Sequence, residues 1–335
     1  MKRIVATANA RAALAGNPSD GYGGKTISLA IADFRARVVV YEWSELEILP
    51  PPGDGTRFPS LENLAVDVSR NGYYGALRLI KASLKRFHDY CVESKIALPD
   101  QQFSLRYETN VPRGVGLAGS SAIITATFRA LQGFYGVEIP LPLLPNWVLS
   151  VEKEELRIQG GLQDRVAQAY GGLTFMDFDA AGFERDGHGH YERLDPALLP
   201  PLYLAYQTEL AEPSDVVHND LRARYDAGDP AVHAAMEELK VISGAARSAI
   251  LGGDSEELAR QIDANFEVRR RIMNIAPGHQ KMVDTARECG ASANFAGSGG
   301  AIIGTFDGSP QSYAQLQGSL GALGCKVIRP TIAHS

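Results

Sequence analysis

Alternating and helically spaced apolar side chains divide the first third of the chain into strands and a helix. Residues 1–50 contain two apolar stretches, IVATANARAALAG and KTISLAIADFRARVVVYEW, separated by a glycine-rich turn, and this pattern predicts two strands. Residues 102–110 (QFSLRYETN) alternate as a strand does. Between these segments, residues 61–93 carry apolar side chains at helical spacing and predict a helix. The spacing is seen at Leu77, Ile80, Leu84 and Phe87.

The rest of the chain mixes helices and strands. We expect a helix from about Ser120 to Tyr135, a second before the segment GGLQD, a third in DRVAQAYGG, and a strand in LTFMDF. PLYLAYQTE predicts a strand, residues 214–288 predict two or three charged helices, and SANFAGSGGAIIGTF and CKVIRPTIA are strand-like. Strict strand–helix alternation is missing, so the pattern favours an α+β fold in two lobes over a doubly wound sheet. The proline-rich stretch LDPALLPPLY suggests a boundary that gives domains 1–195 and 196–335.

Composition narrows the function classes. A chain of 335 residues favours two domains, and a net charge of −6 disfavours a nucleic-acid-binding protein. The three cysteines, Cys91, Cys289 and Cys325, lie far apart without a CxxC pair, which disfavours a disulfide framework or a structural zinc site. The first residues are too polar for a signal peptide, and no apolar run reaches membrane-spanning length. We therefore expect a cytoplasmic protein without a membrane partner.

The strongest motif is PRGVGLAGSSA at residues 112–122, which runs into the predicted helix. Glycines let a backbone approach a polyphosphate closely, and the helix start presents unpaired N–H groups and a positive dipole end. Ser120 and Ser121 can cap the helix, and one hydroxyl can bind Mg²⁺. A glycine-rich turn with a serine cap would carry the same letters. The dinucleotide fingerprint GxGxxG, with Glu138 downstream, also matches, but it needs neither the paired serines nor Pro112.

Residues 150–172, SVEKEELRIQGGLQDRVAQAYGG, carry candidate carboxylates. Glu152, Glu154 and Glu155 sit on a predicted helix, and Asp164 follows a Gly-Gly break that can turn it into a cleft. A kinase needs one carboxylate for Mg²⁺ and another near the attacking hydroxyl. A solvated helix face would explain the glutamates equally well, and a helix N-cap would explain the aspartate.

Two further turns carry polar or glycine residues. Arg11, Asn17 and Asp20 fall at the turn between the first two predicted strands, where they can grip hydroxyls or a phosphate. Ordinary turn chemistry also favours Asn-Pro and Asp-Gly at such a position. Later in the chain, Gly297 and Ser298 open a glycine-rich loop between strand-like segments, which suits close packing on phosphates.

Taken in this order, the motifs resemble the GHMP kinase superfamily, which includes galactokinase, homoserine kinase, mevalonate kinase and phosphomevalonate kinase. PRGVGLAGSSA resembles its phosphate loop with one residue more than the commonest form. FAGSGGA resembles its late glycine motif, although Asn294 stands where the superfamily usually has a lysine. RAALAGNPSD resembles the galactokinase signature, with Asn17 in place of its glutamate. EKEELRIQGGLQD resembles the galactokinase stretch from the Mg²⁺ glutamate to the base aspartate, which selects Glu152 and Asp164.

A second set of segments is spread over nearly the whole chain: GNPSDGYGGKTISL, NGYYGALRL, NVPRGVGLAGSSAI, GLQDRVAQAYGGL, GHGHY, LLPPLYL, NFEVRRRI and GSGGA. These segments resemble the plant glucuronokinases, and this similarity is closer. This resemblance implies a ribosomal-protein-S5-domain-2-like N-terminal domain and a ferredoxin-like C-terminal domain. It also implies ATP- and Mg²⁺-dependent transfer to the anomeric hydroxyl of D-glucuronate, giving glucuronate 1-phosphate and ADP. The partners are then a sugar acid and ATP, in a monomer or homodimer. Galacturonate, arabinose or a heptose phosphate are alternative substrates, and a non-catalytic sugar or nucleotide sensor is the alternative from another class.

The resemblance also assigns roles to residues. Asp164 is the base, Arg11 stabilises the transferred phosphoryl group and contacts the substrate, and Asn17 and Asp20 bind the sugar. Mg²⁺ is held by Glu152 and Ser121, with Ser120 as the less favoured hydroxyl. The ATP phosphates are expected to lie on Gly114, Gly116, Leu117, Ala118, Gly119, Ser120, Ser121, Ala122, Gly297 and Ser298.

Overall fold

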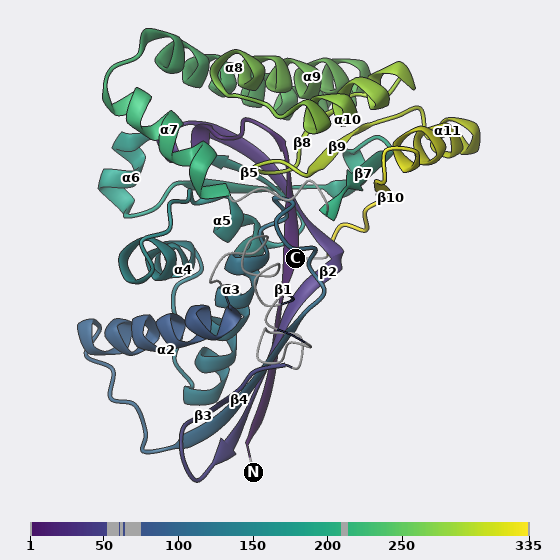
Figure 1. Cartoon of the computed structure of the whole chain (residues 1–335). Helices are drawn as coiled ribbons and strands as arrows, with labels where there is room; N and C mark the ends of the chain where they lie inside the picture. The colour runs from purple at the N-terminus through teal and green to yellow at the C-terminus, as the bar shows by residue number, and fades with distance from the viewer. Residues whose placement is uncertain (1, 52–59, 61–62, 64–74, 209–213, 334–335) are drawn as a thin grey trace.

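The computed structural model describes residues 2–51, 60, 63, 75–208 and 214–333, with backbone alone for 214–219. Within these residues the chain forms two sheets covered by helices, as the α+β prediction requires (Figure 1). The N-terminal part of the helix predicted over residues 61–93 lies outside the described residues, apart from Asn63 and Gly75. Its C-terminal part is confirmed as α2 (Ala76–Glu93).

The larger sheet is built around one long antiparallel pair. β1 (Arg3–Ala15) pairs with one edge of β2 (Lys25–Trp43) along most of its length. The other edge of β2 pairs with β4 (Gln102–Thr109) and with β5 (Leu173–Asp177).

Two short strands complete this six-stranded sheet. β3 (Glu47–Leu49) adds to β4 in parallel, and β6 (His190–Leu194) adds to β5 antiparallel. Burial alternates in the first half of β1 and is continuous in the second half, which contributes Ala10, Ala12, Leu14 and Ala15 to a hydrophobic core cluster. The second half of β1 leads into the polar turn around Asn17.

Four helices cover one face of the larger sheet (Figure 1). They are α2, α3 (Gly119–Tyr135), α4 (Leu144–Ser150) and α5 (Gln163–Tyr170). The helices predicted near 120–135, before GGLQD and in DRVAQAYGG are therefore confirmed. The short helix α6 (Ala180–Asp186) was not predicted.

The smaller sheet is antiparallel and four-stranded, in the order β10 (Lys326–Ile328), β7 (Leu202–Tyr206), β9 (Ala301–Thr305), β8 (Asn294–Phe295). The strands predicted in PLYLAYQTE, SANFAGSGGAIIGTF and CKVIRPTIA are confirmed. An unpredicted helix, α11 (Pro310–Gly321), precedes β10.

The prediction of two or three helices over residues 214–288 is wrong, because the structure has four. They are α7 (Ser214–Asp226), α8 (Pro230–Gly252), α9 (Ser255–Ile272) and α10 (Pro277–Glu288). Asp229 and Asp254 cap the first N–H groups of α8 and α9, and proline begins α8 and α10. Cap and proline signals separate consecutive helices even where the apolar spacing continues.

The hydrophobic core runs across both sheets. Its largest cluster joins Leu14 and Ile27 of the larger sheet to Leu239 and Ile262 of α8 and α9 and to Ile303 of the smaller sheet. The C-terminal tail also returns to β2, where Ile332 bridges Ile31. The division into domains 1–195 and 196–335 therefore stays a proposal: it separates the strands of the two sheets but cuts through this shared core.

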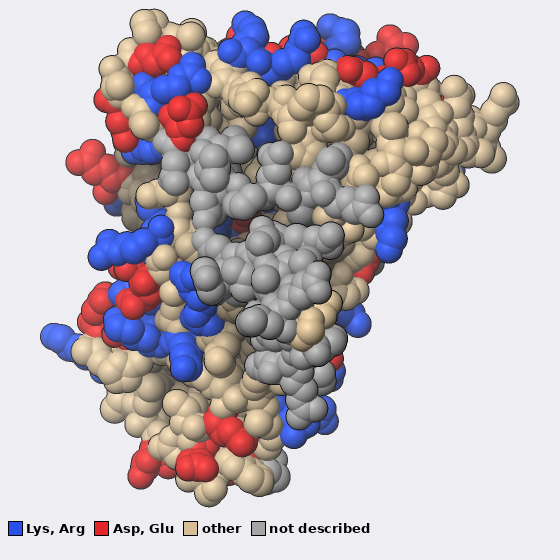
Figure 2. Space-filling view, in the orientation of Figure 1, with Lys and Arg blue, Asp and Glu red and all other residues tan. Residues whose placement is uncertain are grey.

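The described residues bear on two of the features considered above, membrane-spanning helices and cysteine pairing. None of the helices there is both long and apolar enough to cross a membrane. All three cysteines are free thiols. Figure 2 shows acidic and basic side chains interspersed along the upper and left sides of one face.

Candidate active site

A cavity of about 1070 Å³ lies where the glycine-serine loop, the N-terminal turn, the carboxylate segment and the late glycine loop meet. Nearly all the predicted site residues line it. Ser121 and Ala122 do not, because they are fully buried inside α3. The lining includes Arg11, Asn17, Asp20, Gly114, Gly116, Leu117, Ala118, Gly119, Ser120, Glu152, Asp164, Gly297 and Ser298.

The two glycine loops touch backbone to backbone. Gly116 has a φ of +71°, and a Cβ there would lie 2.7 Å from the Ser298 amide nitrogen. The same approach brings Gly297 against the Gly116 carbonyl. Only glycine combines the left-handed conformation with this contact. Sequence reasoning found both loops, but nothing in the sequence showed that residues so far apart meet.

The helix α3 begins at Gly119, with Ala118 as its N-cap in a left-handed conformation and no side-chain cap. The two serines therefore do not cap the helix. Their hydroxyls point to different partners: Ser120 Oγ donates to Glu152 Oε1 at 2.8 Å, and Ser121 Oγ donates to the Ala118 carbonyl at 3.1 Å. The fold thus brings Ser120, and not Ser121, to the carboxylate.

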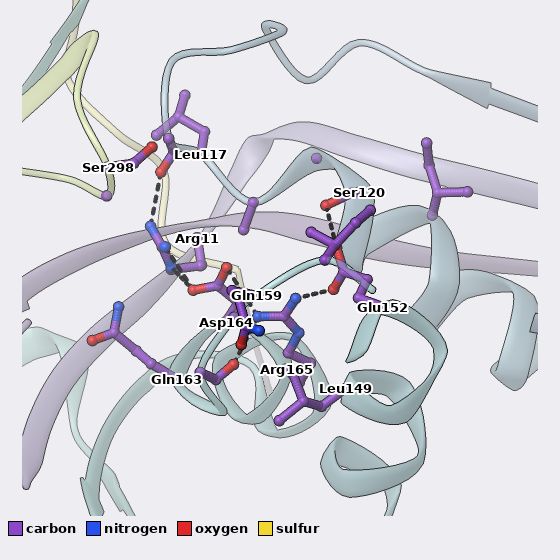
Figure 3. Close-up of a pocket in the computed structure, with 18 of the residues that line it drawn as sticks. Arg11, Leu117, Ser120, Leu149, Glu152, Gln159, Gln163, Asp164, Arg165 and Ser298 are labelled. Carbon is purple, nitrogen blue, oxygen red and sulfur yellow. Dashed lines mark hydrogen bonds and ion pairs between the residues drawn. The ribbon is translucent and has the colours of Figure 1, made fainter. Parts of the chain in front are cut away.

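Glu152 sits in a π-helical turn, η2 (Val151–Glu155), that continues α4. Such turns insert an extra residue and are frequent at functional sites. The Glu152 side chain is buried and pairs with Arg165 as well as Ser120 (Figure 3). The other two glutamates of the segment pair with α2 residues instead: Glu155 with Lys85 and Glu154 with Arg86. Among the three glutamates, Glu152 alone lines the cavity.

Asp164 lies in the first turn of α5, opposite Arg11 of β1 (Figure 3). Arg11 Nε and Nη2 both lie 2.6 Å from Asp164 Oδ1, while Oδ2 is 3.4 Å from Arg165 Nη1. Arg11 Nη1 donates to the carbonyls of Gly116 and Ala296, so this guanidinium also joins the two glycine loops. The N-cap of α5 is Leu162, so Asp164 is not a cap.

Asp20 packs tightly against the Gly-Gly break. A Cβ on Gly161 would fall 1.9 Å from Asp20 Oδ2, and that oxygen accepts a hydrogen bond from the Gln163 amide. Burial, and then the charge of Asp164, raise the pKa of Asp20 to about 6. The hydrogen bond to Gln163 and the nearby arginines act in the opposite direction. Near pH 6 this carboxyl therefore changes between a protonated form that can donate a hydrogen bond and an ionised form that only accepts.

Asn17 is buried in a network of amides. Its Nδ2 donates to the Phe295 carbonyl at 3.1 Å, and its Oδ1 accepts from Asn294 Nδ2 at 3.0 Å and from Asn265 Nδ2 at 3.3 Å. The two positions that depart from the superfamily pattern, Asn17 and Asn294, are therefore direct neighbours. One N–H of Asn17 remains for a ligand. Its role in sugar binding stays a prediction.

Sequence reasoning missed two buried arginines that line the cavity, Arg165 and Arg269. Arg165 pairs with Glu152 and donates to the Gly161 carbonyl, and burial lowers its pKa to about 10. Arg269 of α9 donates through Nη2 to the Gly297 carbonyl at 2.8 Å, and burial lowers its pKa to about 9. A signal existed for Arg269, since it continues the helical spacing of Leu258, Ile262 and Asn265, which are all buried.

The chain is similar to known proteins in both sequence and fold. Residues 76–172 match the model of the GHMP kinases N terminal domain. Glucuronokinase 1 of Arabidopsis thaliana is 43% identical over 88% of this chain and 82% of its own length. The Lin0012 protein from Listeria innocua aligns over 99% of this chain and 98% of its own, with a TM-score of 0.80 at 14% identity.

Galactokinase from Lactococcus lactis, solved in complex with galactose, also has the same fold. It covers 100% of this chain and 94% of its own, with a TM-score of 0.75 at 14% identity. The chain belongs to the GHMP kinase family and is an ATP-dependent phosphotransferase similar to the plant glucuronokinases.

Proposed function

We propose that the chain is a sugar-1-kinase that transfers the γ-phosphoryl group of ATP to the anomeric hydroxyl of D-glucuronate. The products are glucuronate 1-phosphate and ADP. The observation that carries the proposal is the meeting of three groups in one cavity: the glycine loops, the Ser120–Glu152 pair and the Arg11–Asp164 pair. The preference for a sugar acid draws its support from the similarity to Glucuronokinase 1.

The glycine loops suit the ATP phosphates. Gly114 and Gly116 adopt left-handed conformations beside the start of α3, where amide N–H groups without helical partners are available to an anion. Ser298 faces the same cavity from the late glycine loop. Ser121 and Ala122, although predicted as phosphate contacts, lie inside α3, so we expect the phosphates to reach the loop only as far as Ser120.

The Ser120–Glu152 pair fits Mg²⁺. Mg²⁺ prefers oxygen ligands and is usually held by one or two protein groups together with substrate phosphates and water. A hydroxyl and a carboxylate 2.8 Å apart at the wall of the cavity provide such groups. When bound, Mg²⁺ would neutralise charge on the phosphates of ATP. We therefore assign the serine ligand to Ser120 in place of the predicted Ser121.

The Arg11–Asp164 pair fits the reacting end of the sugar. Arg11 holds Oδ1 of Asp164, and we assign Oδ2, which lies 3.4 Å from Arg165 Nη1, to orient the O1 hydroxyl and receive its proton. Arg11 also contacts both glycine loops, so its charge can act on the phosphoryl group during transfer. Asp20, packed against Gly161 beside this pair, is placed to bind sugar hydroxyls. We expect positioning and electrostatics to supply most of the rate increase.

A panel of sugars tests the proposal. ADP release should be measured with D-glucuronate, D-galacturonate, L-arabinose, a heptose phosphate and D-glucose under the same ATP and Mg²⁺ concentrations. We expect the highest kcat/KM with D-glucuronate, with phosphate found on O1 of the product. A higher value with another sugar would reassign the substrate within the same fold. Binding of sugar and ATP without ADP formation would indicate a non-catalytic sensor.

A further inference from the structure

Arg269 is a buried cation in the cavity wall whose hydrogen-bonding groups are only partly used. Its side chain is 1% exposed. Nη2 donates to the Gly297 carbonyl, whereas Nε and Nη1 have no hydrogen-bond partner among the described residues. The guanidinium lies over the Phe295 ring, 5.1 Å from its centroid. The structure thus leaves two buried N–H-bearing atoms of one charged group without partners at the edge of the cavity.

The other buried arginines of the cavity are paired with acids. Arg11 has Asp164, and Arg165 has Glu152. The charge of Asp20 acts on Arg269, but no carboxylate of the described residues lies within ion-pair distance of it. Burying a charge without a counter-charge costs several kcal/mol in real proteins. A ligand that carries a negative group would offset this cost, and a neutral ligand would not.

The position of Arg269 is fixed by the rest of its helix. Asn265, one turn earlier on α9, donates to the Asn17 carbonyl and accepts from the Gly16 amide at 2.6 Å. These contacts tie the same face of α9 to the N-terminal turn. The next two residues, Arg270 and Arg271, are exposed and pair with the surface acids Glu267 and Glu238. Of the three consecutive arginines, only the first belongs to the cavity.

We propose that Arg269 receives the carboxylate of the sugar acid and so determines specificity for uronates; this rests on the proposed function. A guanidinium presents a planar fork of donors that matches a carboxylate. Arg11 and Arg269 hold the carbonyls of consecutive residues, Ala296 and Gly297, whose Cα atoms are about 3.8 Å apart. Arg11, Asp164 and Arg269 all line the same cavity, so one sugar can place O1 near the Arg11–Asp164 pair and its carboxylate at Arg269.

Asn17 is the weaker candidate for this role. Its amide oxygen and one of its N–H bonds already have protein partners, and it carries no charge. Arg269 has unused donors and a full charge in the same cavity wall. We therefore assign the carboxylate to Arg269 and the shaping of the turn to Asn17.

Two enzymes tested with two ligands isolate the contact between Arg269 and the sugar carboxylate. The wild-type enzyme and Arg269→Gln are each tested with D-glucuronate and with D-glucuronamide, in which a neutral amide replaces the carboxylate. Binding is measured by calorimetry without ATP, and kcat/KM by ADP release. We expect the wild type to prefer the acid on the order of 10²-fold, and Arg269→Gln to reduce this preference to a few-fold. The ratio cancels any damage to the Gly297 loop, because such damage affects both ligands alike.

The other outcomes overturn the inference or the proposed function separately. An unchanged acid-to-amide ratio in Arg269→Gln, with equal losses on both ligands, would assign Arg269 to the phosphoryl group or to loop structure and overturn the inference. A wild-type enzyme that prefers D-glucose to both ligands would overturn the proposed function. Arg270→Gln is the matched control and should leave the acid-to-amide ratio unchanged, both in calorimetric binding and in kcat/KM. If Arg269→Gln fails to fold, the neutral variant Arg269→Met removes the charge at a similar side-chain length, and an unchanged ratio there also overturns the inference.

Discussion

Replacing Gly116 by alanine should uncouple the two glycine loops. The change has two costs in the structure. First, an L-residue at a φ of +71° costs about 1–2 kcal/mol in backbone conformation. Second, the new Cβ would lie 2.7 Å from the Ser298 amide nitrogen and 3.1 Å from the Gly299 carbonyl oxygen. Opening the shorter contact to the ~3.5 Å of ordinary van der Waals packing moves one loop by roughly 0.8 Å.

Such a displacement falls on the surface that we assign to the ATP phosphates. A misplacement of about 1 Å in a catalytic arrangement costs on the order of 10²-fold in rate. We therefore expect Gly116→Ala to lower kcat/KM for ATP by about that factor, with a smaller effect on binding of the sugar alone. Steady-state kinetics with ADP release measure the first quantity, and calorimetry with D-glucuronate measures the second.

Gly136→Ala is the matched control. Gly136 ends the same helix, α3, with a φ of +69°, and a Cβ there meets nothing within 4 Å. It should lose about the same 1–2 kcal/mol in the free energy of unfolding, measured with urea, and keep its kcat/KM. Equal kinetic losses in the two variants would refute the reasoning, since backbone strain without the loop contact would then explain both.

Three further predictions concern the acids and hydroxyls of the cavity. Asp164→Asn should lower kcat by roughly 10²-fold or more with little change in calorimetric sugar affinity; near-normal turnover in a folded variant would remove its assignment. Ser120→Ala should raise the Mg²⁺ concentration needed for half-maximal rate by about tenfold or more. Ser121→Ala should mainly lower the free energy of unfolding, by about 1 kcal/mol. A raised Mg²⁺ requirement in Ser121→Ala, with none in Ser120→Ala, would restore Ser121 as the ligand. The pKa of Asp20 is raised to about 6 in the folded protein, so as the pH rises this carboxyl ionises first in the unfolded chain. The free energy of unfolding of the wild type should therefore fall as the pH rises from about 4 to about 6. Asp20→Asn should lack that contribution, so its unfolding free energy relative to wild type should rise over this range by up to ~3 kcal/mol; a constant difference would contradict it.

Local patterns sufficed for most of the secondary structure. The apolar spacing of α2 and α3, the alternation of β4 and the long apolar runs of β1 and β2 are properties of neighbouring residues, and the structure follows them. The number of helices after residue 214 was missed because Asp229 and Asp254 act as caps through one or two side-chain hydrogen bonds each, which the apolar spacing does not reveal.

The sequence by itself determined which segments carry the chemistry. Glycines that allow a close backbone approach, a serine pair at a helix start and acids beside a Gly-Gly break are recognisable wherever they fold, because each motif works through its own backbone and neighbouring side chains. The likeness of these motifs to one kinase superfamily also identified the fold, which the comparisons confirm.

Only the tertiary structure decided which side chains meet. Arg11 and Asp164 are separated by 153 residues along the chain yet share a hydrogen bond, and Gly116 touches a loop from the opposite end of the sequence. Successive helical residues point about 100° apart, so the phase of α3 against η2 selects Ser120 over Ser121, and the phase of α9 buries Arg269 while exposing Arg270. That phase is set by packing against distant elements, and for this reason the sequence alone could name the candidates but could not choose between adjacent ones.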